Sequence, residues 1–215
     1  MWKHAAAALG AALGMASAQA GEIYGNVGLP GVMIGYAQPI NNQFAVRVDV
    51  ASLGSINIDG TEEGIDYEGK ARAHRLGLFG DWFVFGGGFR LTGGITVNDT
   101  RANLRAQGDG QTVTVGNNDY VLTSDDRIDV RVKFPRVTPY LGIGYGHQPS
   151  GTGWGFVFDL GASIGKARVS GEASGPVLSN DAAQEDFERE LDEWRDGAGK
   201  VRAIPQISIG VNYRF

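Results

Sequence analysis

Cysteine is absent from this sequence of 215 residues. The chain therefore cannot be a small secreted scaffold held by disulfides, nor a secreted lipoprotein, whose anchor needs a cysteine after the cleavage site. Long hydrophobic runs are also absent, because no stretch beyond residue 20 reaches the roughly 18 apolar residues of a membrane-spanning helix. If the protein is embedded in a membrane, only a closed β-barrel remains, since every backbone polar group must be paired inside lipid.

Histidine is scarce, and its three copies are His4, His74 and His147. No two of them share the spacing that would place them on one face of a helix or strand, so the sequence predicts no metal site. No base and nucleophile are positioned together, and we expect no catalytic residues, no cofactor and no enzymatic activity. A net charge of −5 disfavours nucleic acid as a partner, because binding it needs a basic surface.

The N-terminus predicts a secretion signal. Lys3 provides a basic start, residues 5–16 form a weakly apolar stretch, and Ala18-Gln19-Ala20 fits a small-x-small cleavage site. We therefore expect residues 1–20 to be a signal peptide and residues 21–215 to be the mature protein, a single β-barrel domain.

Alternation of apolar and polar residues is the main structural signal. Pro205 to Phe215 alternate without a break, which gives a strand one apolar and one polar face. The same alternation recurs over residues 44–51, 75–82, 89–98, 141–146 and 154–165. Each stretch is near the roughly 9–11 residues that a tilted strand needs to cross a membrane. Glycine, with 34 residues, is well above its usual share of about 7%, and a narrow barrel needs it for curvature and close packing.

Eight antiparallel strands are the expected number, because a single-chain bacterial barrel has an even count. The N-terminal region then divides into strands at 22–28 and 32–38, with a bend at Leu29-Pro30-Gly31. The alternative keeps 22–38 as one strand and takes the eighth from 111–123, which otherwise resembles a small hairpin above the membrane. The predicted fold class is all-β, an eight-stranded antiparallel transmembrane β-barrel with a short helix in an extracellular loop.

That helix is predicted over Asp181 to Gly199, an insertion at about residues 180–198. The candidate N-caps are Ser179, Asn180 and Asp181, and Gly197 is the expected C-cap. An apolar stripe runs along the helix at i, i+4 and i+7, made of Phe187, Leu191 and Trp194. We expect this stripe to pack on the barrel rim or on a neighbouring loop. The alternative is a lid, or a contact for an extracellular partner or a lipid headgroup.

Polar side chains fall on the face of the predicted strands that points away from lipid. They form a candidate polar network in the lumen: Arg47, Asp49, Arg75, Asp81, Arg90, Asp159, Asn212 and Arg214. Buried charges are tolerated only when they are paired, and eight strands leave an interior just wide enough for side chains to fill. We interpret the network as a plug of salt bridges and hydrogen bonds, as in the OmpA-type transmembrane domain. The alternative is a narrow path whose charges select small solutes.

The end of the chain resembles the closing strand of Gram-negative outer-membrane proteins. Val211, Tyr213 and Phe215 occupy alternate positions, and the resemblance implies that the barrel-assembly machinery reads them as an assembly signal. It also implies that Phe215 lies at the periplasmic rim, which fixes the direction of every other strand. The expected outside loops are 57–66, 99–128 and 175–200, and the expected periplasmic turns are 39–42, 81–86 and 147–152.

Three other segments carry a broader resemblance: Gly80-Asp81-Trp82-Phe83, Gly87-Gly88-Phe89-Arg90-Leu91 and Pro139-Tyr140-Leu141-Gly142-Ile143-Gly144. With the terminal Tyr213-Arg214-Phe215, they look like a widespread, largely uncharacterised proteobacterial family of outer-membrane barrels in the OmpA/OmpW size class. The resemblance implies an outer-membrane protein in contact with lipid and lipopolysaccharide. Some relatives are identified as CarO-like ornithine uptake porins, which implies a channel for small basic amino acids.

Two functional hypotheses follow. The first is a non-enzymatic structural or surface protein whose lumen is mostly filled by side chains. The second is a narrow porin-like channel for small solutes, cationic and amino-acid-like in character. Neither hypothesis predicts an oligomeric state.

Overall fold

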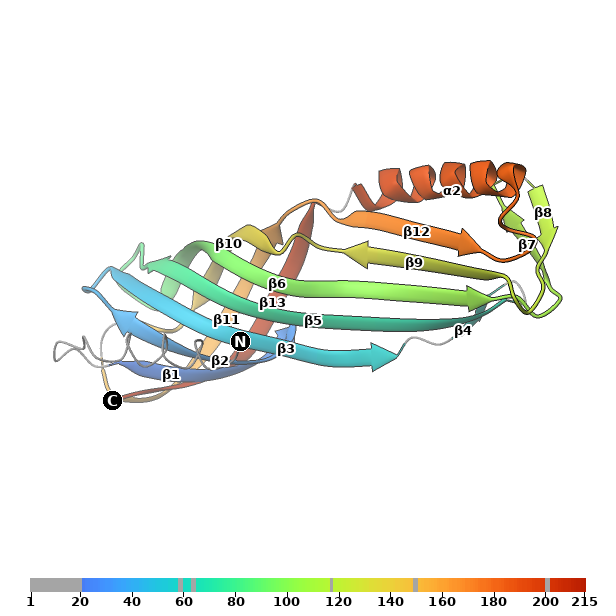
Figure 1. The fold of residues 1–215 in the computed structure, drawn as a ribbon. Helices are drawn as coiled ribbons and strands as arrows, with labels where there is room; N and C mark the ends of the chain where they lie inside the picture. Colours follow the sequence, from blue (N-terminus) through green and yellow to red (C-terminus); the bar gives the residue numbers. More distant parts are fainter. Residues whose placement is uncertain (1–20, 58–59, 63–64, 117, 149–150, 200–201) are drawn as a thin grey trace, which may run out of the picture.

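The computed structural model describes residues 21–57, 60–62, 65–116, 118–148, 151–199 and 202–215. The expected signal peptide, residues 1–20, lies outside these ranges. Within them the protein is mostly antiparallel β-structure with one helix. Figure 1 shows two parts, a ring of strands at one end and a sheet that continues from one side of the ring at the other. No helix in the described ranges combines the length and the apolar character needed to cross a membrane.

Eight strands form the ring. They are β1 (Glu22–Leu29), β2 (Gly31–Pro39), β3 (Phe44–Asn57), β5 (Ile65–Trp82), β6 (Phe89–Gln107), β10 (Val137–Tyr145), β11 (Gly153–Ile164) and β13 (Ala203–Arg214). Each strand is antiparallel to both neighbours, and β13 returns to β1 with Arg214 opposite Glu22. The predicted eight antiparallel strands are therefore confirmed. The single-strand alternative for 22–38 is wrong, because the chain reverses at Pro30 and Val27 pairs with Val32.

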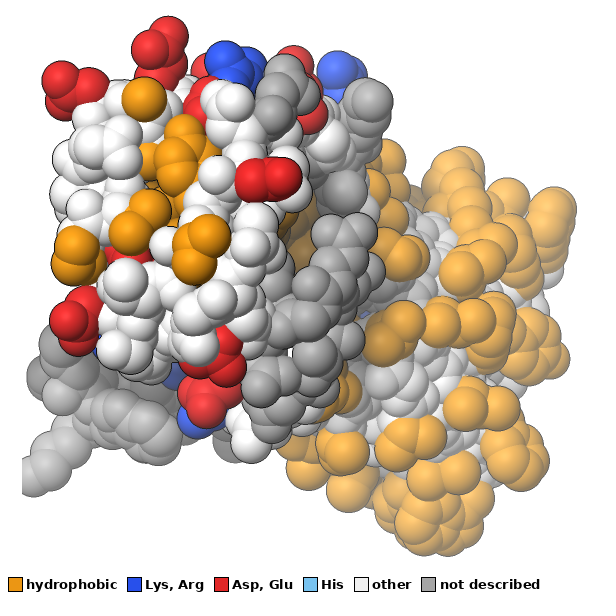
Figure 2. Space-filling view, turned by 90° about the vertical axis from the view of Figure 1, so that its right-hand side faces the viewer, with side chains coloured by type: hydrophobic (Ala, Val, Ile, Leu, Met, Phe, Trp, Pro, Cys, Tyr) orange, Lys and Arg blue, Asp and Glu red, His pale blue; other side chains and the backbone are white. Residues whose placement is uncertain are grey.

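The ring strands have one apolar and one polar face. On β6, Leu91, Ile95 and Val97 point outward and are exposed, whereas Arg90 and Thr92 point inward and are buried. Strand geometry produces this arrangement directly, because successive side chains alternate between faces. Figure 2 shows the result: hydrophobic side chains gather over the ring, and polar and charged side chains dominate the part beyond it.

The part beyond the ring, called the extension below, is a sheet with a cover on one face. β5 and β6 run on from the ring, β9 (Arg127–Lys133) pairs with β6, and β12 (Arg168–Ser174) pairs with β9. β4 (Gly60–Glu62) pairs with β5. The cover consists of helix α2 (Asp181–Gly199) and the hairpin of β7 (Thr112–Val115) and β8 (Asn118–Val121), as Figure 1 shows. The predicted hairpin within 111–123 is confirmed.

Two of the expected outside loops contain more strand than predicted. The segment 99–128 is not one loop, because β6 continues to Gln107 and β9 already begins at Arg127. The segment 57–66 likewise contains β4 and the start of β5, and the expected turn 81–86 begins too early because β5 runs to Trp82. β12 was not predicted at all. β9 and β12 have only seven residues each, fewer than the roughly 9–11 that a membrane-crossing strand needs. The apolar face of β12 also carries only Val169 and Ala173, so its alternation is weak.

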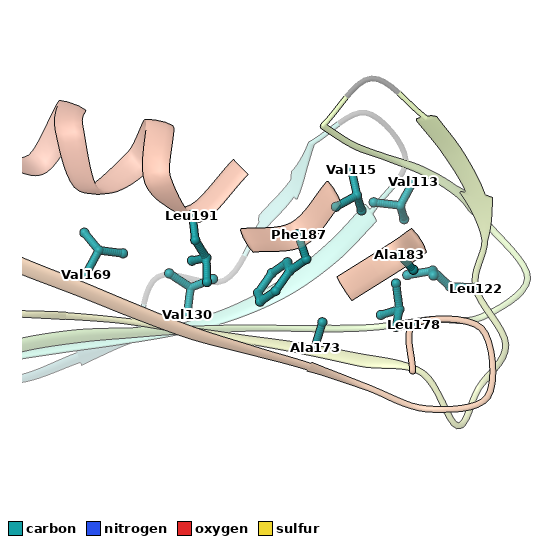
Figure 3. Packing of buried hydrophobic residues seen from close by; sticks show 10 residues of the cluster. All are labelled: Val113, Val115, Leu122, Val130, Val169, Ala173, Leu178, Ala183, Phe187 and Leu191. Atoms are coloured by element: carbon teal, nitrogen blue, oxygen red, sulfur yellow. The ribbon is translucent and has the colours of Figure 1, made fainter. Parts of the chain in front are cut away.

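A hydrophobic core lies between the extension sheet and its cover (Figure 3). Its buried members are Val113, Val115, Leu122, Val130, Val169, Ala173, Leu178, Ala183, Phe187 and Leu191. Of the candidate N-caps, Asn180 caps the helix, since its Oδ1 accepts a hydrogen bond from the Ala183 amide at 2.9 Å. The expected C-cap is wrong, because the helix passes through Gly197 and ends at Gly199.

The predicted apolar stripe packs only in part. Phe187 and Leu191 are buried against the extension sheet, which agrees with the expected packing on neighbouring structure. Trp194 instead remains exposed, and its indole N–H donates to Glu190 at 2.9 Å. Seven residues turn a helix by about 700°, so Trp194 lies on the same face as Phe187. Its exposure follows from its position along the helix, since the buried core residues of α2 end at Leu191.

Candidate functional site

The candidate site is the interior of the ring. The structure places the eight residues of the candidate polar network on the inward faces of their strands, and each is buried: Arg47, Asp49, Arg75, Asp81, Arg90, Asp159, Asn212 and Arg214. They come from β3, β5, β6, β11 and β13. Six of them are charged groups that meet in the middle of the ring, and Asn212 and Arg214 lie toward the end of β13.

Four of these side chains form a closed set of ion pairs, called the central cluster below. Arg47 binds Asp81 through two nitrogens, at 2.5 and 3.2 Å, and reaches Asp159 at 3.3 Å. Arg90 contacts the same two carboxylates, Asp159 at 2.5 Å and Asp81 at 3.3 Å. The Thr92 hydroxyl donates a further hydrogen bond to Asp81 at 2.6 Å. Each charge in the cluster is therefore neutralised by two partners from different strands.

A second pair extends this cluster toward the extension. Arg75 contacts Asp49 at 2.6 Å and also donates to Gln206. The Tyr24 hydroxyl donates to Asp49 at 3.2 Å. Phe79 contacts both sets, because the Arg47 and Arg75 guanidinium groups lie 5.1 and 5.3 Å from its ring centre. Such cation–π contacts favour the buried positive charges.

The charges in the middle of the ring balance. Arg47, Arg75 and Arg90 face Asp49, Asp81 and Asp159, so these groups together have no net charge. Desolvating an ion costs several kcal/mol, and only close pairing offsets that cost. Removing one partner would leave another charge uncompensated, which makes these groups depend on each other.

Little space remains between these side chains. The cavity lined by Arg47, Asp49, Arg75, Phe79 and Tyr140 measures about 10 Å³, which is no more than the space that one water molecule needs. Glycines on the inward face allow this dense filling. A side chain at Gly161 would overlap the Tyr140 hydroxyl, and one at Gly94 would lie 2.7 Å from the Phe79 ring. Bulky residues thus occupy the volume that their glycine neighbours leave open.

An uncharged layer lies nearer the extension. Thr96 is hydrogen-bonded to Thr138 at 2.8 Å and to Ser163 at 2.9 Å. Asn98 donates to Thr138 at 2.9 Å, and Gln206 donates to Ser163 at 2.6 Å. The predicted polar network did not include this layer, because it was chosen mainly from charged residues and these side chains are uncharged. The inward alternation of Thr92, Thr96 and Asn98 on β6 was the available signal.

The opposite end of the interior is closed by Glu22, Arg214 and His147. Glu22 contacts Arg214 at 2.6 Å across the β1–β13 pairing, and it also contacts His147. The His147 ring packs edge-on against Tyr24, with centroids 4.5 Å apart. Burial, with the nearby charges of Arg47 and Arg90, lowers the pKa of His147 well below its usual range. His147 lies between β10 and β11, within the predicted turn, but its burial in the ring interior was not predicted. The alternation of Glu22 and Tyr24 on β1 was the available signal that polar side chains point inward at this end.

The outer surface of the ring is apolar, and its two ends differ. Aromatic residues gather at the strand ends farthest from the extension: Phe44, Trp82, Phe89, Tyr145, Trp154 and Tyr213. Phe44 stacks on Trp82 at 6.4 Å, and Trp154 meets Tyr213 at 5.2 Å. The end next to the extension is aliphatic, with Val32, Val50, Leu76, Val97, Val137 and Ile164 exposed. Aromatic bands of this kind are typical of membrane–water interfaces.

The residues of the predicted assembly signal belong to this outer surface. Val211, Tyr213 and Phe215 are all exposed on the outward face of β13 or just after it. Their recognition by the barrel-assembly machinery stays a prediction.

Comparison with known proteins supports the fold. No family model and no curated protein sequence matches the chain. Among solved structures it is similar to CarO of Acinetobacter baumannii, with 17% identity, a TM-score of 0.55, and coverage of 92% of this chain and 97% of that one. CarO2 of the same species gives 17% identity and a TM-score of 0.56, with coverage of 91% and 98%.

A major outer membrane protein of Thermus thermophilus is more distant, with 10% identity, a TM-score of 0.40, and coverage of 91% and 99%. The likeness to CarO, at this identity, shows the fold alone. The chain thus has the fold of outer-membrane β-barrel proteins. Its closer relation to the OmpA/OmpW size class stays a prediction.

Proposed function

We propose that this chain is an integral outer-membrane β-barrel protein of a Gram-negative bacterium, with a structural or surface role and no enzymatic activity. The observation that carries the proposal is the filled, charge-balanced interior of the ring, with about 10 Å³ of space among its central side chains. The apolar outer face and its aromatic end support placement in a membrane. The fold shared with CarO agrees with this placement.

The proposed orientation puts the extension outside the cell. Barrels of this class have short turns on the periplasmic side and long segments on the outer side. The turn between β5 and β6 is short, whereas the segment between β6 and β10 holds β7, β8 and β9. The extension would then carry the surface role, and the ring would serve as its anchor.

Conductance across a planar lipid bilayer tests the proposal. Refolded protein should give no openings above the lipid baseline, because its central groups leave no continuous path. A variant with Phe79→Ala and Tyr140→Ala should conduct, since it removes two large inward side chains. Phe156→Ala with Phe158→Ala is the matched control, because these aromatics point outward. Regular openings of the unaltered protein would refute the filled-lumen proposal.

The second candidate is a narrow channel for small cationic solutes. One observation favours it: Arg47 contacts both Asp81 and Asp159, so it would keep one carboxylate partner if the other bound a passing cation. In that case the unaltered protein conducts with a preference for cations. Asp159→Asn would reduce that preference, because the substitution removes a carboxylate from the path.

A further inference from the structure

The outer face of the extension carries basic residues in a row. By the strand register, Arg72 lies opposite Arg101, Arg101 opposite Lys133, and Lys133 opposite Arg168. Neighbouring strands are about 4.8 Å apart, so four cations stand side by side across β5, β6, β9 and β12. Like charges directly opposite each other destabilise a sheet. The stability of the sheet therefore does not explain why four cations lie side by side.

The next row is also basic. It contains Lys70, Asn103, Arg131 and Ser170, again in register across the same four strands. We call the six cations of both rows the cationic face: Lys70, Arg72, Arg101, Arg131, Lys133 and Arg168. α2 covers the opposite side of the sheet, because Leu104, Val130 and Val169 point toward it. On the cationic face, Lys70, Arg131, Lys133 and Arg168 are exposed, and Arg72 and Arg101 are partly exposed.

Acidic partners for this face are few. Asp99 contacts Arg72 at 3.0 Å and Arg101 at 3.5 Å. Lys133 and Arg168 make no ion pair with any residue that the structure describes. Among the described residues, six cations and one contacting carboxylate leave an excess of positive charge that an external anion can neutralise.

The cationic face lies at the height of a membrane headgroup. β6 presents Leu91, Ile95 and Val97 outward in the ring and Arg101 outward four positions later. A strand rises about 3.3 Å per residue, so Arg101 lies roughly 13 Å along the strand from the last apolar residue. Because the strand is tilted by about 40°, this places the first basic row about 10 Å beyond the apolar surface and on the same side of the sheet.

Farther from the ring the charge changes sign. The third row contains Glu68, Arg105, Asp129 and Glu172, with three carboxylates to one guanidinium. A hollow of about 300 Å³ spans the second and third rows, lined by Asn103, Arg105, Asp129, Val130, Arg131, Ser170, Gly171 and Glu172. The excess of positive charge is therefore confined to the first two rows, which lie nearest the ring. A long soluble polyanion would meet repulsion at the third row.

We propose that the cationic face binds the phosphate groups of lipopolysaccharide in the outer leaflet, with the hollow beside it receiving adjoining sugars. This inference rests on the proposed outer-membrane placement and names a partner for it. Phosphate is the anion at this height in that leaflet, and guanidinium groups bind it through paired hydrogen bonds. Binding would join the extension to the membrane surface on the side opposite α2.

The test measures lipopolysaccharide binding by the full-length folded protein in detergent micelles. We expect binding that weakens as salt is added, and weaker binding of chemically dephosphorylated lipopolysaccharide. The variant Arg101→Gln, Lys133→Gln, Arg168→Gln should lose affinity on the order of 100-fold at low salt, from about 1 kcal/mol for each surface cation. The matched control is Arg127→Gln, Arg189→Gln, Arg195→Gln, which removes the same charge from positions outside the cationic face and the hollow and should retain binding.

Two outcomes would overturn the inference. One is equal binding of phosphorylated and dephosphorylated lipopolysaccharide by the unaltered protein, a comparison that needs no variant to fold. The other is tight binding of a sulfated polysaccharide through Arg101, Lys133 and Arg168 without binding of lipopolysaccharide. Failure of the filled-lumen proposal is seen separately, as conductance, and failure of membrane placement as a protein that stays soluble without detergent.

Discussion

Arg47 lies at the centre of the ring interior, since it binds Asp81 and Asp159 and lies over the Phe79 and Tyr24 rings. Alternation along β3 was enough to predict that Arg47 and Asp49 point inward. The pairing was not predictable, because Asp81 and Asp159 lie 34 and 112 residues away and their approach depends on the register of strands around the ring. For a single residue, the direction of the side chain can thus be predicted from the local sequence, whereas its ion-pair partner cannot.

Replacing Arg47 with methionine should destabilise the ring by about 3–5 kcal/mol, because Asp81 and Asp159 each lose a buried partner. Urea unfolding of the protein in detergent, followed by gel mobility, measures the change. Arg105→Met is the control, since Arg105 is exposed and its ion pair with Asp129 lies on the extension. Equal stability of the two variants would contradict the ion-pair network.

His147 should make stability depend on pH near neutrality. Its pKa is below the usual value of about 6.5 in the folded protein, so below about pH 6.5 the unfolded chain takes up a proton that the folded chain does not. The free energy of unfolding should therefore fall as pH decreases from about 6.5 to 5. In His147→Gln that part of the slope should disappear, which unfolding curves across pH 5 to 8 will measure. An unchanged slope would show that other groups cause it.

At the scale of elements, α2 was predictable and its neighbours β9 and β12 were not. The helix was indicated by Asn180 at its start and by the apolar spacing of Phe187 and Leu191. β9 and β12 have seven residues each, with charged outer faces and modest inner residues. Such strands are stabilised by α2 and the hairpin packed against them, and that contact is absent from the local sequence.

Asp126 holds the cover of the extension together. It accepts hydrogen bonds from the Thr123 amide and hydroxyl at 2.9 and 2.7 Å, and from the amides of Val177 and Leu178 at 2.9 and 3.2 Å. The segment after β8 is thereby tied to the segment before α2. Burial alone would raise the pKa of Asp126, but these hydrogen bonds outweigh it and hold the pKa below its usual range.

Asp126→Asn should loosen the cover by about 1–3 kcal/mol, because an amide cannot accept all four hydrogen bonds with the same strength. Limited proteolysis should cut near α2 faster while the ring stays intact. In the unaltered protein the same loosening should appear as pH falls below about 3.8 toward the lowered pKa of the folded state, since the carboxylate is then protonated. The neighbouring exposed Asp125→Asn is the control, and equal cleavage of both variants would exclude this role.

On the scale of the whole molecule, the same local sequence pattern repeats in every strand of the ring, whereas the extension has no such repeated pattern. Large outward residues recur in every ring strand, so the number of strands and their faces followed from the sequence. The extension depends on contacts among β6, β9, β12 and α2, which are brought together only once the chain has folded. The strands of the ring could thus be predicted and counted from the sequence, whereas the architecture of the extension could not.

Tryptophan fluorescence tests the placement of the whole molecule in a bilayer. Trp82 and Trp154 are exposed on the outer face of the ring, by 45% and 77%, whereas the 43% exposed Trp194 lies on α2. In single-tryptophan variants, brominated lipid should quench Trp82 and Trp154 and leave Trp194 bright. A comparable exposed fraction makes Trp194 the internal control for Trp82. Equal quenching of all three would contradict an extension that stands clear of the hydrocarbon.

The pairing of β1 with β13 gives assembly a fixed final step. Glu22 and Arg214, which meet across that pairing, are 192 residues apart in the chain. Until β13 arrives, β1 and β11 each present an open edge with unpaired backbone groups, a template for wrong association. Contacts this distant in sequence also form slowly. The incomplete protein therefore needs protection for nearly its whole length, and the Glu22–Arg214 contact marks the moment when that need ends.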